Sequence, residues 1–338
     1  MSDVDERSRA IVWVDAFRAP VVGRIIDRVG ETIDVVAVGG PPSSEVDTLA
    51  TNLGCPRYDD LRRMRIDHPC GVMLAAAEDD GPTALVEQHE NPFTLLALEP
   101  PWRQLGDLHD ANNKTRGGRR RVGPAPTGQS TYEPAGSFLS CEGWQRAADP
   151  SELLQGVELV RYFSAGPRTS QSLFGRLFEA WHLLLTLTEL PRTIDASCSR
   201  PISGDDLRSL TGSLSVHVRH SGGICASLDV SDATGASHRQ LQAIGPAVEL
   251  AVGDRGYRLW GATGEVLETQ GDPECDTTVP IEDLVAEHWQ RTFSRNAAPA
   301  RAAPLEQVLA CCVATQLSAR TGEPERPEAI LTMENWSL

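Results

Sequence analysis

The sequence predicts an α/β protein of two domains, in which a doubly wound parallel sheet is followed by an α+β domain with an open, mainly antiparallel sheet. Over the first hundred residues, continuous apolar runs alternate with amphipathic stretches, as in a parallel sheet covered by helices on both faces. From Gly156 onward, apolar and polar residues alternate within short segments separated by Gly and Asp, as in antiparallel strands with one solvated face. A chain of 338 residues is long enough for two such cores.

The N-terminal domain is expected to span residues 1–105 and to consist of buried strands joined by helices. The stretch 19–30 repeats its apolar residues at the helical period and ends at Gly30, and the stretch 43–54 begins at a Ser cap and ends at Gly54. Right-handed crossovers between the strands follow from the twist of the sheet. The predicted strands are 10–14, 33–40, 70–77 and 93–99, and the predicted helices are 19–30, 43–54 and 82–90.

The second domain is expected to span residues 137–322, after a connection at 106–136 that is rich in Gly and Pro and has no apolar period. A tail at 323–338 would follow it. The strongest helix of this domain lies in the stretch 172–191 and carries a stripe of Leu and Trp, with Pro191 beyond its end. Two further helices, 280–294 and 304–322, each open with Pro. The predicted strand segments are 156–166, 193–199, 213–223, 224–235, 239–256 and 257–270.

Composition limits the partners and the chemistry. The net charge of −16 would repel both a nucleic-acid backbone and an anionic membrane, so neither is an expected partner. The N-terminus lacks the apolar core of a signal peptide and no stretch is long enough to span a bilayer, so a cytoplasmic protein is expected. The eight cysteines show no zinc-ligand spacing, and no metal site is predicted. Lys114 is the single lysine of the chain.

Four stretches occur in the order and spacing of a known family: "DVVAVGG" with the later "YDDLRRM", "LLALEPP", the helix that carries His182, and "LSARTGEPERP". Through them the chain resembles the Gfo/Idh/MocA family of NAD(P)-dependent sugar and polyol oxidoreductases. The resemblance implies a Rossmann-like first domain of the dinucleotide-binding type. It also implies a small polyhydroxy ligand in an interdomain cleft, and a homo-oligomer formed through the open sheet of the second domain.

The residues that would bind the cofactor depart from the family pattern. A dinucleotide-binding turn needs three glycines after the first strand, and the matching positions here are Asp15, Phe17 and Pro20. Asp15 would place a carboxylate where the helix N-terminus meets a phosphate. Arg18 would offset that charge, but not the bulk of Phe17. The second strand ends in Gly39 where the family has an acidic residue for the ribose, and Glu45 lies farther on, in the first turn of a predicted helix.

The catalytic positions depart in the same way. The family's Glu-Lys-Pro is represented by Glu99 followed by Pro100, so the lysine that exchanges a proton with the substrate hydroxyl is absent. His182 matches the catalytic histidine of the family, and Glu179, three residues earlier, is a candidate to orient its ring. A core histidine with one satisfied nitrogen remains the other interpretation of His182.

Together these features predict a non-catalytic relative that keeps the scaffold for ligand binding, regulation or assembly and takes no cofactor. Asp15, Phe17, Arg18, Gly39 and Glu99 are then positional matches to the cofactor site. The alternative is an active NAD(P)-dependent oxidoreductase of a sugar or polyol, with His182 as acid and base. A third interpretation is an interaction protein that uses its open sheet alone.

Overall fold

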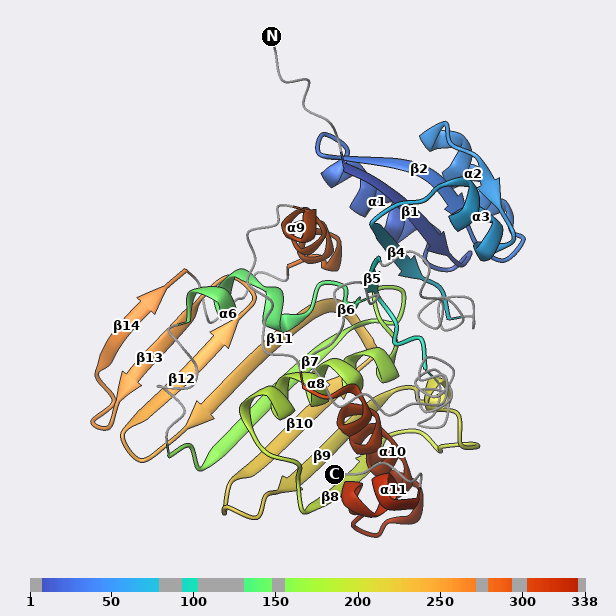
Figure 1. The fold of residues 1–338 in the computed structure, drawn as a ribbon. Helices are drawn as coiled ribbons and strands as arrows, with labels where there is room; N and C mark the ends of the chain where they lie inside the picture. The colour runs from blue at the N-terminus through green and yellow to red at the C-terminus, as the bar shows by residue number, and fades with distance from the viewer. Residues whose placement is uncertain are drawn as a thin grey trace, which may run out of the picture. The chain divides into compact units, whose positions relative to one another are not determined.

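The computed structural model describes residues 8–78, 93–102, 131–147, 156–271, 279–293 and 303–333. The chain divides into two compact units, which Figure 1 shows as separate sheets with their helices. Of the described residues, unit 1 comprises 8–78, 93–102, 131–136 and 281–293, and unit 2 comprises 137–147, 156–271, 279–280 and 303–333.

Unit 1 contains a six-stranded parallel sheet in the order β3-β2-β1-β4-β5-β6. The chain starts at β1, moves outward to β3, and then returns to build the other half from β4, so the order reverses between β1 and β4. All five residues of β4 are buried, because the strands of a parallel sheet are covered on both faces. The strands are β1 (Ser8–Val14), β2 (Ile33–Gly39), β3 (Arg57–Tyr58), β4 (Val72–Ala76), β5 (Thr94–Ala97) and β6 (Thr131–Pro134).

The helices of unit 1 begin and end at the residues that their sequence favours. Ser43 caps α2 (Ser44–Leu53) by accepting the N–H of Val46, and Gly54 ends it in the left-handed conformation. The other helices are α1 (Ala19–Val29), α3 (Leu61–Asp67) and α9 (Ile281–Phe293). Although α9 lies far along the chain, it packs on α1, where Arg24 pairs with Glu282 at 2.6 Å and Arg28 pairs with Asp283.

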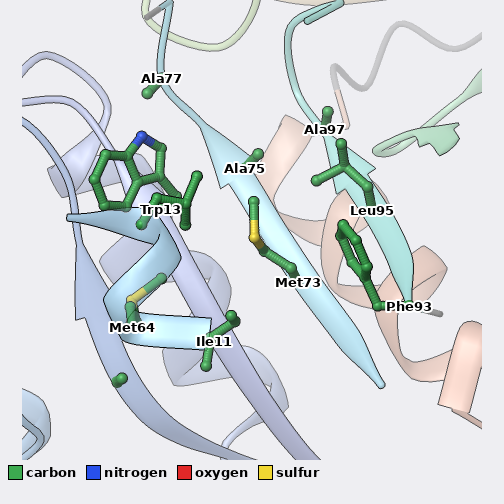
Figure 2. Packing of buried hydrophobic residues seen from close by; sticks show 11 residues of the cluster. Ile11, Trp13, Met64, Met73, Ala75, Ala77, Phe93, Leu95 and Ala97 are labelled. Carbon is green, nitrogen blue, oxygen red and sulfur yellow. The ribbon is translucent and has the colours of Figure 1, made fainter. Parts of the chain in front are cut away.

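One cluster of buried side chains forms the core on one side of this sheet (Figure 2). Met64 of α3 packs with Trp13 of β1, Met73 of β4 and Leu95 of β5 in this cluster. A Cβ atom on Gly39 would lie 2.6 Å from the ring of Trp13, so glycine is required there to let the indole pack against β2.

Unit 2 contains an eight-stranded sheet in the order β14-β13-β12-β11-β7-β10-β9-β8. Strands β7 and β10 pair in parallel, and the other neighbours are antiparallel. Buried and exposed residues alternate along β9 and most of β10, as a sheet with one open face requires. The strands are β7 (Leu159–Pro167), β8 (Thr193–Cys198), β9 (Ser213–Arg219), β10 (Cys225–Ser231), β11 (Ala233–Ile244), β12 (Val248–Gly253), β13 (Tyr257–Gly261) and β14 (Val266–Gln270).

Helices lie against the buried face of this sheet. The longest are α8 (Leu173–Leu187), which packs on β7 and β10, and α10 (Leu305–Thr321), which packs on β8 and on α8. Trp181 of α8 donates its indole N–H to Thr315 of α10 at 3.0 Å, which fixes the two helices against each other. The remaining helical segments are α6 (Glu142–Arg146), α11 (Pro327–Met333) and the short 3-10 helices Phe138–Ser140 and Leu207–Ser209.

The fold class predicted from the sequence is confirmed, but the structure divides the chain differently. β6 lies within the predicted connection at 106–136 and adds the sixth strand of the parallel sheet. Helix α9 belongs to unit 1, and the predicted tail contains α11. The predicted helix 82–90 and Lys114 lie outside the described residues. No helix of the described part of the chain is long and apolar enough to cross a membrane.

Candidate functional site

The candidate site lies at the carboxyl edge of the parallel sheet of unit 1. In open α/β sheets, ligands bind where the strand order reverses, just beyond the carboxyl ends of the strands. That position here lies between β1 and β4. Three acidic residues follow neighbouring strands at this edge: Asp15 after β1, Glu78 after β4 and Glu99 after β5.

All three carboxylates converge on the guanidinium of Arg18, at the start of α1. Arg18 Nη1 donates to Asp15 at 2.8 Å, and Nη2 donates to both Glu78 at 2.7 Å and Glu99 at 2.6 Å. The side chain of Arg18 is fully buried, and that of Glu99 nearly so. We call these four residues the Arg18 cluster. It joins the loop after β1 to the ends of β4 and β5.

The charges of the Arg18 cluster stabilise one another because the guanidinium is removed from water. Burial by itself would lower the pKa of Arg18, but the charges of Glu99, Asp15 and Glu78 outweigh it and raise that pKa above the value of a free arginine. Arginine therefore stays charged at any working pH and cannot exchange a proton with a substrate. With three carboxylates around one guanidinium, the cluster carries a formal charge of about −2.

The loop between β1 and α1 does not fit a pyrophosphate in the position that a glycine turn provides. The N–H groups of Arg18 and Ala19, which begin α1, both donate to Asp15, and Pro20 has no N–H to offer. Phe17 stands at the second glycine position with half of its side chain exposed. The backbone donors that would meet a phosphate are thus used by the chain itself.

Gly39, another positional match to the cofactor site, has a structural explanation, and Glu45 lies where the sequence predicts it. Gly39 ends β2, where it allows Trp13 to pack closely. Glu45 lies in the first turn of α2, where its charge suits the helix dipole.

In unit 2, Glu179 does not make the contact that the sequence predicts for it. Its Oε1 accepts the backbone N–H of Phe138 and Nη1 of Arg239, both at 2.6 Å. Arg239 also donates to Asp254 at 2.6 Å from Nη2. Neither Glu179 Oε2 nor His182 Nδ1 has a hydrogen-bond partner among the described residues, so these two atoms are not bonded to each other. Glu179 positions Arg239 and not the imidazole.

His182 is a buried residue of α8. Burial lowers the pKa of His182 from 6.5 to about 4, so the ring is neutral at pH 7. A neutral imidazole can accept a proton but has none in excess to donate as a strong acid. The acid and base role expected for His182 stays a prediction.

The residues that sequence reasoning missed are Glu78, Arg239 and Asp254. Arg239 is the one with a visible signal, because it alternates with Leu241 and Ala243 and so takes an inward position on β11. An inward arginine requires acceptors around it that compensate its charge. Which carboxylates supply the charge depends on the packing of α8 and of the turn after β12.

Replacing Arg18 by Met should destabilise unit 1 by about 3 kcal/mol or more at pH 7, because it removes the guanidinium that three carboxylates share. Chemical denaturation at pH 7 measures the loss. Arg28→Met, which removes a half-exposed pair with Asp283, is the control and should cost less than about 1 kcal/mol. Equal losses in the two variants would contradict this account.

His182 should make unit 2 less stable in acid. Because its pKa is depressed in the folded state, the unfolded chain binds more protons between pH 6.5 and about 4, and stability falls as the pH drops through that window. The total is about 3 kcal/mol. His182→Leu should remove this part of the acid sensitivity, whereas His217→Leu, at an exposed position of β9, should not. Unfolding curves between pH 7 and 4 that are parallel for His182→Leu and the unmodified protein would refute the prediction.

The sequence matches no family model and no curated protein, but many solved structures share the fold. An oxidoreductase from Agrobacterium radiobacter, in complex with NAD+, L-tartaric acid and magnesium, is 14% identical with a TM-score of 0.65, over 96% of this chain and all of that one. A myo-inositol dehydrogenase from Corynebacterium glutamicum is 14% identical with a TM-score of 0.66, over 95% and 98%. A levoglucosan dehydrogenase with NADH and L-sorbose is 9% identical with a TM-score of 0.68, over 95% and 98%.

These structures contradict the prediction that the chain takes no cofactor, since two of the three hold NAD+ or NADH. They confirm the resemblance seen in the sequence at the level of the fold. The low sequence identities agree with the departures from the family pattern in the loop after β1 and at Pro100. The chain therefore has the two-domain fold of the Gfo/Idh/MocA-type oxidoreductases, in a divergent form.

Proposed function

We propose that this chain is a ligand-binding relative of the sugar and polyol dehydrogenases that does not transfer hydride by the lysine-dependent route of the family. The observation that supports the proposal most directly is the environment of Glu99. Its carboxylate is bound to Arg18 at 2.6 Å, and the next residue, where the family has lysine, is Pro100. Proline has no titratable atom, and arginine holds its proton too tightly to exchange it.

No lysine of the described residues lies at this edge to take the role of the missing one. A general base works best with a pKa near the operating pH. The pKa of Arg18, the cation of the Arg18 cluster, is far above that range. We therefore assign the carboxyl edge of unit 1 to recognition and not to proton transfer.

The ligand class that we propose is a small polyhydroxy molecule. The proposal is supported by the similarity of this fold to proteins whose structures contain L-tartaric acid or L-sorbose. Carboxylates such as Asp15 and Glu78, which are only partly buried, accept hydrogen bonds from hydroxyl groups.

The test separates binding from turnover. Purified protein is incubated with NAD+ or NADP+ and a panel of polyols and sugars, and formation of the reduced cofactor is followed by its absorbance. We expect no turnover with any pair. Thermal unfolding with each compound measures binding independently, and a ligand at a hundredfold excess over its Kd should add about 2.7 kcal/mol of stability. Sustained reduction of either cofactor would overturn the proposal.

A second candidate is an active NAD(P)-dependent oxidoreductase of a sugar or polyol that uses His182 as its acid and base. The observation that favours it is the neutral ring of His182, whose Nδ1 has no hydrogen-bond partner in the described part of the chain. This candidate predicts turnover in the same assay and its loss in His182→Gln. An active protein whose rate is unchanged by that substitution would exclude the role of His182.

We also propose that the open face of the unit 2 sheet binds a second copy of the chain. Exposed residues of both charges lie on this face, so it can pair with itself about a two-fold axis. Phe163 stands opposite Asp229 in the strand register and is 41% exposed, an uncommon position for an aromatic ring on a polar face. The charged residues are Arg161, Asp195, Arg219 and Asp229.

Phe163→Asp should convert the oligomer to a monomer, because it places a charge where the two apolar rings would meet. Light scattering coupled to size exclusion measures the mass. Ile66→Asp is the control, since Ile66 is 78% exposed on α3 of unit 1 and lies outside this face. A monomeric unmodified protein, or an oligomer that survives Phe163→Asp, would rule out this interface.

A further inference from the structure

We infer that the carboxylate of Asp15 occupies, from within the chain, the anion position at the N-terminus of α1, so that the loop between β1 and α1 is a phosphate site filled by its own side chain. The inference does not rest on the proposed function. It concerns what the loop binds and what keeps an external ligand out.

The donors around Asp15 are of the kind that binds phosphate at a helix N-terminus. Asp15 Oδ1 accepts the backbone N–H of Arg18 at 2.9 Å. Asp15 Oδ2 accepts Arg18 Nη1 at 2.8 Å and the backbone N–H of Glu78 at 3.2 Å. Two backbone N–H groups from separate segments and a guanidinium thus converge on one carboxylate. Backbone N–H groups at a helix start, together with arginine, are the usual partners of a phosphate group.

A second observation concerns Arg18 itself. Its side chain is fully buried, and Nε has no hydrogen-bond partner among the described residues. A buried charged donor without an acceptor is costly. The three carboxylates therefore leave the Nε–H donor of the guanidinium unsatisfied, although together they carry more charge than the guanidinium does. A phosphate group offers more acceptor oxygens than a carboxylate does.

The other two carboxylates of the Arg18 cluster also disfavour an external anion. Glu78 and Glu99 bind the guanidinium at 2.7 and 2.6 Å, and their charges oppose an incoming anion. An external phosphate must also displace Asp15, which is held nearby by the chain and so competes at high effective concentration. The apparent affinity for a phosphate-bearing ligand is then reduced by the fraction of molecules in which Asp15 is bound.

The test compares the unmodified protein with Asp15→Ala and with Asp15→Ala/Glu78→Gln, titrated with inorganic pyrophosphate by calorimetry at constant ionic strength in chloride. An Asp15 that is bound in about 90% of molecules lowers affinity about tenfold, so we expect Asp15→Ala to bind at least that much more tightly. The double variant, which removes a second negative charge, should bind more tightly still. NADH, titrated in parallel, distinguishes a dinucleotide from a free phosphate as the source of the bound group.

Asp60→Ala is the matched control. Asp60 caps α3 by accepting the N–H groups of Arg62 and Arg63 at 2.8 and 3.2 Å, and its removal should create no site for pyrophosphate. If Asp15→Ala is too unstable to titrate, Asp15→Asn keeps the size of the side chain and should change the affinity in the same direction. Equal pyrophosphate affinity in the unmodified protein and the Asp15 variants would overturn the inference and leave Asp15 as a helix cap.

Discussion

A buried guanidinium needs acceptors that compensate its charge, and in each of the two units one such guanidinium is bound by carboxylates from separate elements. In unit 1, Arg18 binds Asp15, Glu78 and Glu99, which follow three neighbouring strands. In unit 2, Arg239 binds Glu179 of α8 and Asp254 beyond β12. Loss of either arginine would remove the cation that these carboxylates share in a region with little water, and breaking a buried ion pair in this way is strongly destabilising.

The two arginines differ in what surrounds them. Arg239, Glu179 and Asp254 are all nearly inaccessible, and Phe138 donates its N–H to Glu179, so this network joins α8, β11 and the segment that opens unit 2. Its role is to hold elements together. The Arg18 cluster lies at the edge where an α/β sheet binds its ligands, and Asp15 and Glu78 remain partly exposed. An ion cluster thus lies at the edge where the resemblance to the family implies a glycine turn.

Much of the fold could be predicted because local patterns agree with it. The runs 10–14 and 72–76 are continuously apolar, as buried parallel strands require, and β9 alternates as an open sheet requires. The misses have a shared cause. β6 is a four-residue strand within a stretch rich in Gly and Pro, which hides its pattern. α9 is an amphipathic helix, and its sequence does not show which unit its apolar face packs on. Their positions depend on partners distant in the chain, namely β5 and α1.

The candidate site, too, could be predicted only in part from the sequence. The sequence by itself determined which chemical groups are missing, because the identities of Phe17 and Pro100 exclude a glycine turn and a titratable amine wherever those residues lie. It also determined that Asp15 and Arg18 would be close, since they are three residues apart at the start of a helix. Only the tertiary structure decided that Glu78 and Glu99 join them, and that Glu179 binds Arg239 instead of His182. Charge pairing inside a protein depends on which groups lose their water together, and that is settled by packing between elements far apart in sequence.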